Sequence, residues 1–220
     1  MHLPIGNRLR LIFAALGTSL LLFTGAAQAD EMARAKELVK TRCAKCHGID
    51  GRGIDPRYAS LAGQHSDYLV KQIFNFKTRM RVNQYMEPVA DRLTAAETHL
   101  AAKYFSSLPP GITPASDQEL RTLGQHIYAQ GNPQTGVANC AGCHGVYATG
   151  GALLPRLAGQ NQTYLENQIR SFIHRTRLTD RRMHHVIAAM TEKEISAVSM
   201  YLAAESLWEN PASNWAGGSK

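Results

Sequence analysis

One six-residue motif, which occurs twice, limits what this chain of 220 residues can fold into. Residues 43–48 read Cys-Ala-Lys-Cys-His-Gly, and residues 140–145 read Cys-Ala-Gly-Cys-His-Gly. The pattern Cys-x-x-Cys-His attaches haem c covalently, because two thiols on one short turn can bond to the two vinyl groups of the porphyrin. The histidine that follows is held beneath the ring, where its imidazole can ligate the iron. Each motif therefore predicts one haem c.

Two other uses of a Cys-x-x-Cys pair fit this sequence less well. A thioredoxin-like redox pair belongs to a βαβ pattern and does not need the histidine. A zinc site made from two such pairs usually separates them by about 15–20 residues, and far more residues separate the two motifs here. The predicted covalent attachment sites use all the cysteines of the chain: Cys43, Cys46, Cys140 and Cys143.

The similarity between the two halves of the chain extends beyond the motif. Leu-Ala-Gly-Gln occurs at residues 61–64 and again at residues 157–160. A repeat of this length indicates one domain present in two copies, each with its own haem motif. Further matched pairs are Tyr68/Tyr164, Gln72/Gln168, Phe76/Phe172, Arg79/Arg175, Arg81/Arg177 and Met86/Met183.

The repeat also sets the expected domain boundaries. The first domain is expected over residues 30–108 and the second over residues 117–208. Residues 109–116 form the linker, because their prolines stop the preceding helix and hold the chain extended. Residues 209–220 are rich in Gly, Ser and Asn and are expected to form a flexible tail.

Residues 1–29 are expected to be a cleavable signal peptide. Arg8 and Arg10 give a positive start, and residues 11–23 are mostly apolar. Residues 27–29 read Ala-Gln-Ala, the small-x-small pattern at which a signal peptidase cuts. The apolar run is short for a membrane span, which needs about 20 residues, although an uncleaved anchor is the alternative. Export to the periplasm agrees with haem c, which bacteria attach outside the cytoplasm.

The net charge of +7 is modest. It is compatible with steering toward an acidic partner or an anionic lipid surface, and equally with an ordinary soluble surface. Nucleic acid is disfavoured as a partner by the export signal, and the sequence contains no nucleic-acid-binding motif.

Both copies are predicted to be helical, so the expected fold class is all-α. Asp117 is expected to cap the opening helix of the second copy. Thr94 with Glu97, and Thr191 with Glu194, form capping boxes that start the closing helices. Residues 131–136 of the second copy are expected to form a loop. The expected helices are 31–42 and 118–130 (opening), 68–77 and 164–173 (middle), and those that follow the capping boxes to about Ser107 and Glu205 (closing).

His47 and His144 are the predicted proximal ligands, and the opposite face of each iron needs a second ligand. A thioether there stabilises ferrous iron and suits electron transfer. Met86 and Met183 occupy equivalent places in the repeat, in stretches expected to be polar and non-helical. A single methionine is usually core filler, but packing alone does not explain the matched pair. We therefore expect these two sulfurs to ligate the irons.

His184 and His185 directly follow the second methionine and offer an imidazole in its place. The first copy has Glu87 and Pro88 at the equivalent places, so the repeat favours methionine. Pro155 lies close before the second Leu-Ala-Gly-Gln, where its carbonyl can accept a hydrogen bond from His144. Ala59 occupies the equivalent place in the first copy.

Two roles are possible for each of the other matched polar side chains. The glutamines and tyrosines can hydrogen-bond haem propionates or fix loop backbone. The arginines can neutralise propionates, or can belong to solvated helix ends. The pairs concerned are Gln64/Gln160, Tyr68/Tyr164, Arg79/Arg175 and Arg81/Arg177.

These motifs, the repeated Leu-Ala-Gly-Gln and the matched methionines resemble the dihaem class I cytochromes c of the cytochrome c4 type, from Asp30 to about Ser206. The resemblance implies two tandem cytochrome c domains related by a pseudo-twofold axis, with two covalently bound haem c groups near the shared interface. It also implies periplasmic electron transfer, from a quinol–cytochrome c reductase-type donor and often to a terminal oxidase, sometimes with loose membrane association. The implied iron ligands are His47, Met86, His144 and Met183.

Three function classes follow from these features. The first is an electron carrier that is not an enzyme and has no small-molecule substrate. The second is an enzyme such as a dihaem peroxidase, which would need an open iron; the paired methionines argue against it. The third is the electron-accepting cytochrome subunit of a dehydrogenase, which has the same chemistry and differs in its partner.

Overall fold

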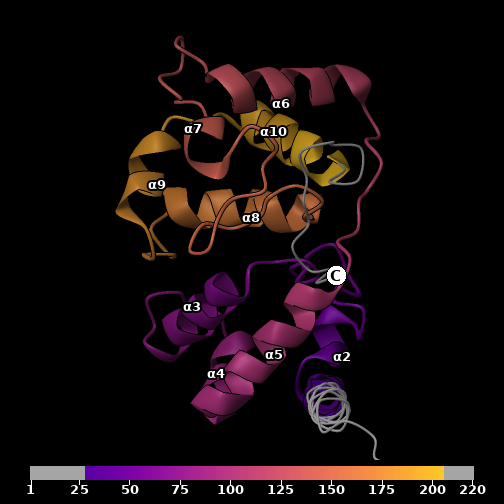
Figure 1. Cartoon of the computed structure of the whole chain (residues 1–220). Coiled ribbons are helices and arrows are strands. Elements are labelled where there is room, and N and C mark those ends of the chain that lie inside the picture. The colour runs from indigo at the N-terminus through magenta and orange to yellow at the C-terminus, as the bar shows by residue number, and fades with distance from the viewer. Residues whose placement is uncertain (1–27, 206–220) are drawn as a thin grey trace, which may run out of the picture.

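The computed structural model describes residues 28–205. The predicted tail and almost all of the predicted signal peptide lie outside these residues. The described chain is all-α, as predicted, and its only β pairing consists of isolated bridges. No helix between residues 28 and 205 is long and apolar enough to cross a membrane. The helices form two groups, which Figure 1 shows as two halves that meet between α3 and α8.

The two halves repeat the same order of elements. Each has an opening helix, a single turn that carries the haem motif, a middle helix, a short helix and a closing helix. The first half contains helical residues 28–42, α2 (Ala44–His47), α3 (Ser66–Lys77), α4 (Met86–Arg92) and α5 (Ala95–Ser107). The second half contains α6 (Gln118–Gln130), α7 (Ala141–His144), α8 (Gln162–Ile173), α9 (Arg181–Val186) and α10 (Glu192–Ala204).

Local capping explains where several helices begin. The side chain of Asp117 accepts a hydrogen bond from Leu120 N over 2.8 Å, so the predicted cap of α6 is confirmed. Both predicted capping boxes are present, at the start of α5 and at the start of α10. Each box pairs two of the backbone N–H groups that a helix start otherwise leaves without partners.

The expectation that both methionines lie in non-helical stretches is wrong. Met86 is the first residue of α4, and Met183 lies inside α9. Polar side chains start both short helices: Asn83 Oδ1 accepts from Met86 N over 2.9 Å, and Asp180 Oδ1 accepts from Arg182 N over 3.0 Å. These side chains satisfy orphan backbone donors, which is enough to begin a short helix in a polar sequence.

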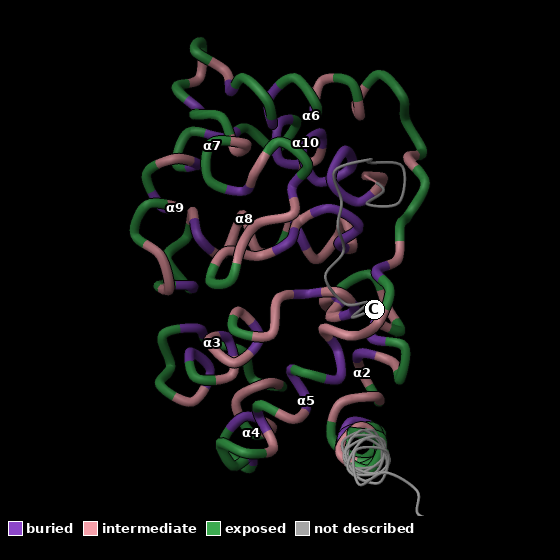
Figure 2. Tube along the Cα trace, in the orientation of Figure 1, coloured by how far each residue is buried: buried purple, intermediate pink, exposed green. Residues whose placement is uncertain are grey.

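Each half has a hydrophobic core of its own. The core of the first half includes Val39 and Phe105, and the core of the second half includes Ile127 and Val198. Gly124 allows α6 to pack tightly on α10, since a Cβ at this position would lie 1.9 Å from the carbonyl oxygen of Ala197. Figure 2 shows buried stretches inside each half and along the boundary between them.

The boundary between the halves is joined by reciprocal contacts. Gln64 exchanges two hydrogen bonds with the backbone of Arg156, at 2.8 and 3.0 Å. Gln160, its match in the repeat, exchanges two with the backbone of Ser60, at 2.6 and 2.9 Å. Arg81 and Arg177 form an antiparallel β-bridge across the same boundary. The same contact is thus made in both directions, as a twofold relation between the copies requires.

Candidate functional site

Two single-turn helices, α2 and α7, carry the haem motifs. Cys43 and Cys140 are the residues that precede these turns, and His47 and His144 are their last residues. Since a helical turn has 3.6 residues, the first cysteine and the histidine of each motif lie on one face. Gly48 and its match in the second half end the turns with φ of 73° and 81°, a left-handed backbone that glycine adopts without strain.

No disulfide joins the motif cysteines in the part of the chain that the structure describes. Burial raises the pKa of Cys43 and of Cys140 to about 11. A thiol-based redox pair needs a lowered pKa, because the thiolate is the reactive form. The environment of these thiols is therefore unlike that of a thioredoxin-like site, and it is compatible with covalent attachment.

Both motif histidines are buried and oriented by a backbone carbonyl. His47 Nδ1 lies 3.0 Å from the carbonyl oxygen of Ala59, and His144 Nδ1 lies 3.4 Å from that of Pro155. The contact predicted for Pro155 is confirmed, and Ala59 makes the equivalent contact in the first half. Burial lowers the pKa of both imidazoles, which favours the neutral form. A neutral ring that donates from Nδ1 leaves the Nε2 lone pair available for iron.

The two methionines lie differently with respect to the cores. Met183 is half-buried and packs against the core of the second half, as does Cys140. Met86 is also half-buried but does not belong to the core cluster of the first half, and it lies on α4, which packs against α3. Their ligation of iron stays a prediction, based on the repeat and on their matched places at or near the start of a short helix.

His184 is buried and hydrogen-bonded to the backbone. Its Nδ1 lies 2.7 Å from the carbonyl oxygen of Phe172, and its ring meets the ring of Phe172 edge to face, with 5.7 Å between centroids. This contact ties α9 to the end of α8. His185, the neighbouring residue, is exposed.

The matched arginines on the interface are buried and make contacts in both directions. Arg81 donates to Gln72 of its own half at 2.9 Å, and to Tyr164 and Gln168 of the other half at 2.6 Å each. Arg177 mirrors this set: it donates to Gln168 of its own half at 2.9 Å, and to Tyr68 and Gln72 of the other half at 2.9 and 3.1 Å. Of the two readings given by the sequence, the solvated helix end is therefore wrong for this pair.

The interface fits a buried group that carries carboxylates. Within residues 28–205, neither Arg81 nor Arg177 forms a salt bridge with an acidic side chain. Burial and the nearby charge of Arg177 lower the pKa of Arg81. Asn75, whose carbonyl accepts from Arg81 N at 3.1 Å, has a buried Nδ2 that no described group accepts from. Buried cations and an unpaired donor are the partners that haem propionates require.

Sequence reasoning missed one buried residue of this region, Arg156. Its side chain donates to the carbonyl oxygens of Ala62 at 2.7 Å, Gly63 at 3.2 Å and Ala158, and so bridges both halves. The repeat hides it, because Ser60 occupies its place in the first copy. The only available signal was its position directly after Pro155.

Comparison with known proteins agrees with this construction. The cytochrome c family model matches residues 32–109 and residues 122–206. Cytochrome c4 of Thiocapsa roseopersicina is 40% identical over 167 residues, which cover 73% of this chain and 85% of that protein. The thiosulfate dehydrogenase electron acceptor of Thiomonas intermedia (strain K12) is 34% identical over 171 residues, covering 75% of this chain and 79% of that protein.

The fold is also similar to a solved structure. The crystal structure of reduced recombinant cytochrome c4 from Pseudomonas stutzeri matches with a TM-score of 0.73 and 29% identity, over 79% of this chain and 98% of that one. Two cytochrome c domains imply two covalently bound haem c groups, one for each Cys-x-x-Cys-His turn. The chain is a dihaem electron-transfer protein, and it belongs to the cytochrome c4 family.

Proposed function

We propose that this cytochrome carries electrons through the periplasm, from a donor of the quinol–cytochrome c reductase type to an acceptor of the terminal oxidase type, as a carrier and not as an enzyme. Each haem supplies a reversible one-electron change between iron(III) and iron(II). The observation that carries the proposal is the twofold arrangement itself, in which two matched centres share one hydrogen-bonded interface.

Each ligating side chain has a defined role in this proposal. Cys43 and Cys46 hold the first haem covalently, and Cys140 and Cys143 hold the second. The imidazole Nε2 of each motif histidine would hold the iron, while its Nδ1 is fixed by a carbonyl. The proposed sulfur ligands on the opposite faces are Met86 and Met183. If both methionines bind as proposed, no position on either iron would be free for a substrate, which suits the transfer of electrons without bond making.

The proposed location follows from the sequence of the first 29 residues. Their positive start, apolar run and small-x-small end are those of an exported protein. Export to the periplasm places the chain where haem c is attached and where respiratory donors and acceptors are accessible. The positive net charge supports encounter with acidic faces on such partners and loose association with anionic lipid.

A second candidate function has specific support from the names of two relatives. The similar protein of Thiomonas intermedia is named a thiosulfate dehydrogenase electron acceptor. In this alternative, the chain receives its electrons directly from a dehydrogenase. Stopped-flow mixing of the oxidised protein with each purified donor distinguishes the two functions, because the physiological donor reduces it fast and saturably.

The ligand set is tested by spectroscopy on the purified protein. We expect two haems per chain and a near-infrared band from methionine bound to ferric iron. The variants Met86→His and Met183→His should each remove about half of this band, since each changes one of two equivalent centres. One haem per chain, a full band in either variant, or rapid binding of carbon monoxide to the reduced native protein would overturn the proposal.

A further inference from the structure

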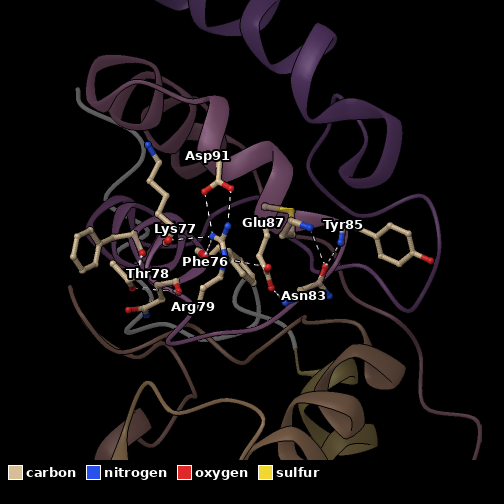
Figure 3. Close-up of polar contacts among 11 residues, drawn as sticks. Phe76, Lys77, Thr78, Arg79, Asn83, Tyr85, Glu87 and Asp91 are labelled. Atoms are coloured by element: carbon tan, nitrogen blue, oxygen red, sulfur yellow. Dashed lines mark hydrogen bonds and ion pairs between the residues drawn. The ribbon is translucent and has the colours of Figure 1, made fainter.

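Arg79 joins the end of α3 to α4 in the first half (Figure 3). Its Nη1 donates to the carbonyl oxygens of Phe76 at 2.7 Å and Lys77 at 3.0 Å, which are carbonyls at the end of α3. The same guanidinium binds Asp91 through two contacts, at 3.1 and 2.8 Å, and its Nε lies 3.2 Å from Glu87 Oε2. One cation therefore caps one helix and holds two acids of the next.

The cluster continues from Glu87 to the backbone of Met86. Glu87 Oε1 accepts from Asn83 N over 2.7 Å. Asn83 Oδ1 in turn accepts from Tyr85 N over 3.0 Å and from Met86 N over 2.9 Å. The labelled side chains of Figure 3 follow this path, from Asp91 through Arg79 and Glu87 to Asn83. The position of the proposed sulfur ligand is thus connected to an ion pair network.

In the second half, the short helix α9 is attached by a hydrogen bond rather than by ion pairs. The places of the two acids are taken by His184 and Ala188, and within residues 28–205 the side chain of Arg175 makes no hydrogen bond or ion pair. His184 Nδ1 donates instead to the carbonyl oxygen of Phe172, the match of Phe76. One hydrogen bond, buried against an aromatic ring, replaces the network of charges.

We propose that Arg79 is a positioning residue for Met86: its ion pairs with Glu87 and Asp91 hold α4 against α3, so that the methionine stays bound to the first iron. This rests on the proposed function, in which Met86 is an axial ligand. The side chains of Arg79 and Asp91 are 47% and 45% exposed, so salt screens their attraction. Charge removal or high salt therefore opens the first centre and leaves the second closed.

Ligand exchange on the ferric protein measures this opening. Added imidazole binds the iron when a methionine leaves it, so the rate at which the near-infrared methionine band disappears reports how often each centre opens. For Arg79→Gln we expect half of the band to disappear about fivefold faster, the change expected when a network of partly exposed ion pairs is lost. Arg79→Lys keeps the charge but not the planar fork, and should restore part of the difference.

Arg175→Gln is the matched control. Arg79 and Arg175 have nearly the same left-handed backbone, with φ of 59° and 56°, so both substitutions change the backbone preference alike. We expect the exchange rate of Arg175→Gln to equal that of the native protein. In the native protein, about 1 M salt should make half of the methionine band disappear faster. In Arg79→Gln, the same salt should leave the rate of the fast phase unchanged.

Different results would contradict the ligand role of Met86 and the positioning role of Arg79. If Met86→His leaves the full band, Met86 is not a ligand and the assignment of the first centre is wrong. If Met86→His halves the band but Arg79→Gln exchanges like Arg175→Gln, the ligand is correct and the role of Arg79 is refuted. Equal acceleration of both halves of the band in Arg79→Gln, with a lower denaturation midpoint, would mean a general loss of stability and would also refute it.

Discussion

Arg156 is the residue at which the two halves depend on one another most directly. It is 2% exposed, and its guanidinium is paired with backbone carbonyls from both halves rather than with an acid. Burial lowers its pKa to about 10, so it stays charged at neutral pH. The charge is therefore retained at a cost in solvation, which the three carbonyl contacts offset.

Replacing Arg156 with methionine should lower the free energy of unfolding by about 1–3 kcal/mol, because it leaves buried carbonyl groups without donors. Denaturant titration of the haem-containing protein measures this change. Arg57, an exposed arginine paired with Asp55, gives the control: Arg57→Met should leave the free energy of unfolding nearly unchanged. Equal stability of the two variants would show that the carbonyl contacts of Arg156 contribute nothing.

Arg156 also shows what sequence comparison between copies reveals and what it misses. The matched residues included the motif turns and the side chains that lie at the interface, since both copies need them, although the repeat alone did not show where their contacts are made. Comparison of the two copies does not single out a residue that has no match, such as Arg156. Its side chain is buried only because two different loops pack around it. The network of Arg79 was hidden in the same way, since its acids Glu87 and Asp91 have no equivalents in the second copy.

At the scale of elements, the closing helices α5 and α10 start with the same capping box, but α10 makes more contacts there. Glu97 and Glu194 both close a capping box. Glu194 also accepts from Asn132 at 2.7 Å and from Thr135 at 2.8 Å, so it ties the extra loop of the second half to α10. Burial by itself would raise the pKa of Glu194, but the hydrogen bonds outweigh it and the pKa is lowered.

Glu194→Ala should therefore cost more stability than Glu97→Ala. We expect about 1–3 kcal/mol for the first and a smaller cost for the second at pH 7, measured by denaturant titration. A carboxyl whose pKa is lower in the folded state stabilises the protein above its unfolded pKa of about 4.3. This contribution is lost as the pH falls from that value through the lower pKa of the folded state, so the cost of Glu194→Ala should shrink over that range. A cost that did not change with pH would contradict this account.

Helix boundaries were the part of the fold that the sequence predicted best. The predicted bounds of α6 agree with the structure, and α3 and α8 each begin two residues before the prediction. Asp117 caps the start of α6 and Gly131 follows its end, whereas the spacing of apolar residues located α3 and α8. The short helices α4 and α9 were missed, because their sequences lack apolar periodicity. The only local indication of them is a polar side chain at the start of each, Asn83 and Asp180.

At the scale of the whole molecule, the interface is built by exchange. The buried glutamines Gln64 and Gln160 each bind the backbone of the opposite half, and the arginines Arg81 and Arg177 each reach the tyrosine and glutamine of the other copy. The sequence could not predict this, because a matched pair in a tandem repeat does not say whether its contacts lie within a copy or between copies. The glutamines proved to fix backbone across the boundary.

Removing both glutamines should uncouple the halves. Gln64→Ala with Gln160→Ala leaves backbone groups of Ser60 and Arg156 unpaired, at about 1–3 kcal/mol for each buried group. We expect the native protein to unfold in one calorimetric transition and this variant to unfold in two, one for each half. The matched control is Gln130→Ala with Gln134→Ala, at exposed sites outside the interface, which should keep one transition. A single transition at the native temperature in the interface variant would be the contrary result.

The exchange of arginine contacts has a consequence for how such a chain could arise. The first half contains Arg81 and also Tyr68 and Gln72, the two groups that receive the arginine of the other half. A single half therefore contains both the donor and the acceptors needed to pair with another copy of itself. On this view, fusion of two genes joined partners that could already associate, and afterwards each copy was free to change wherever its neighbour did not depend on it.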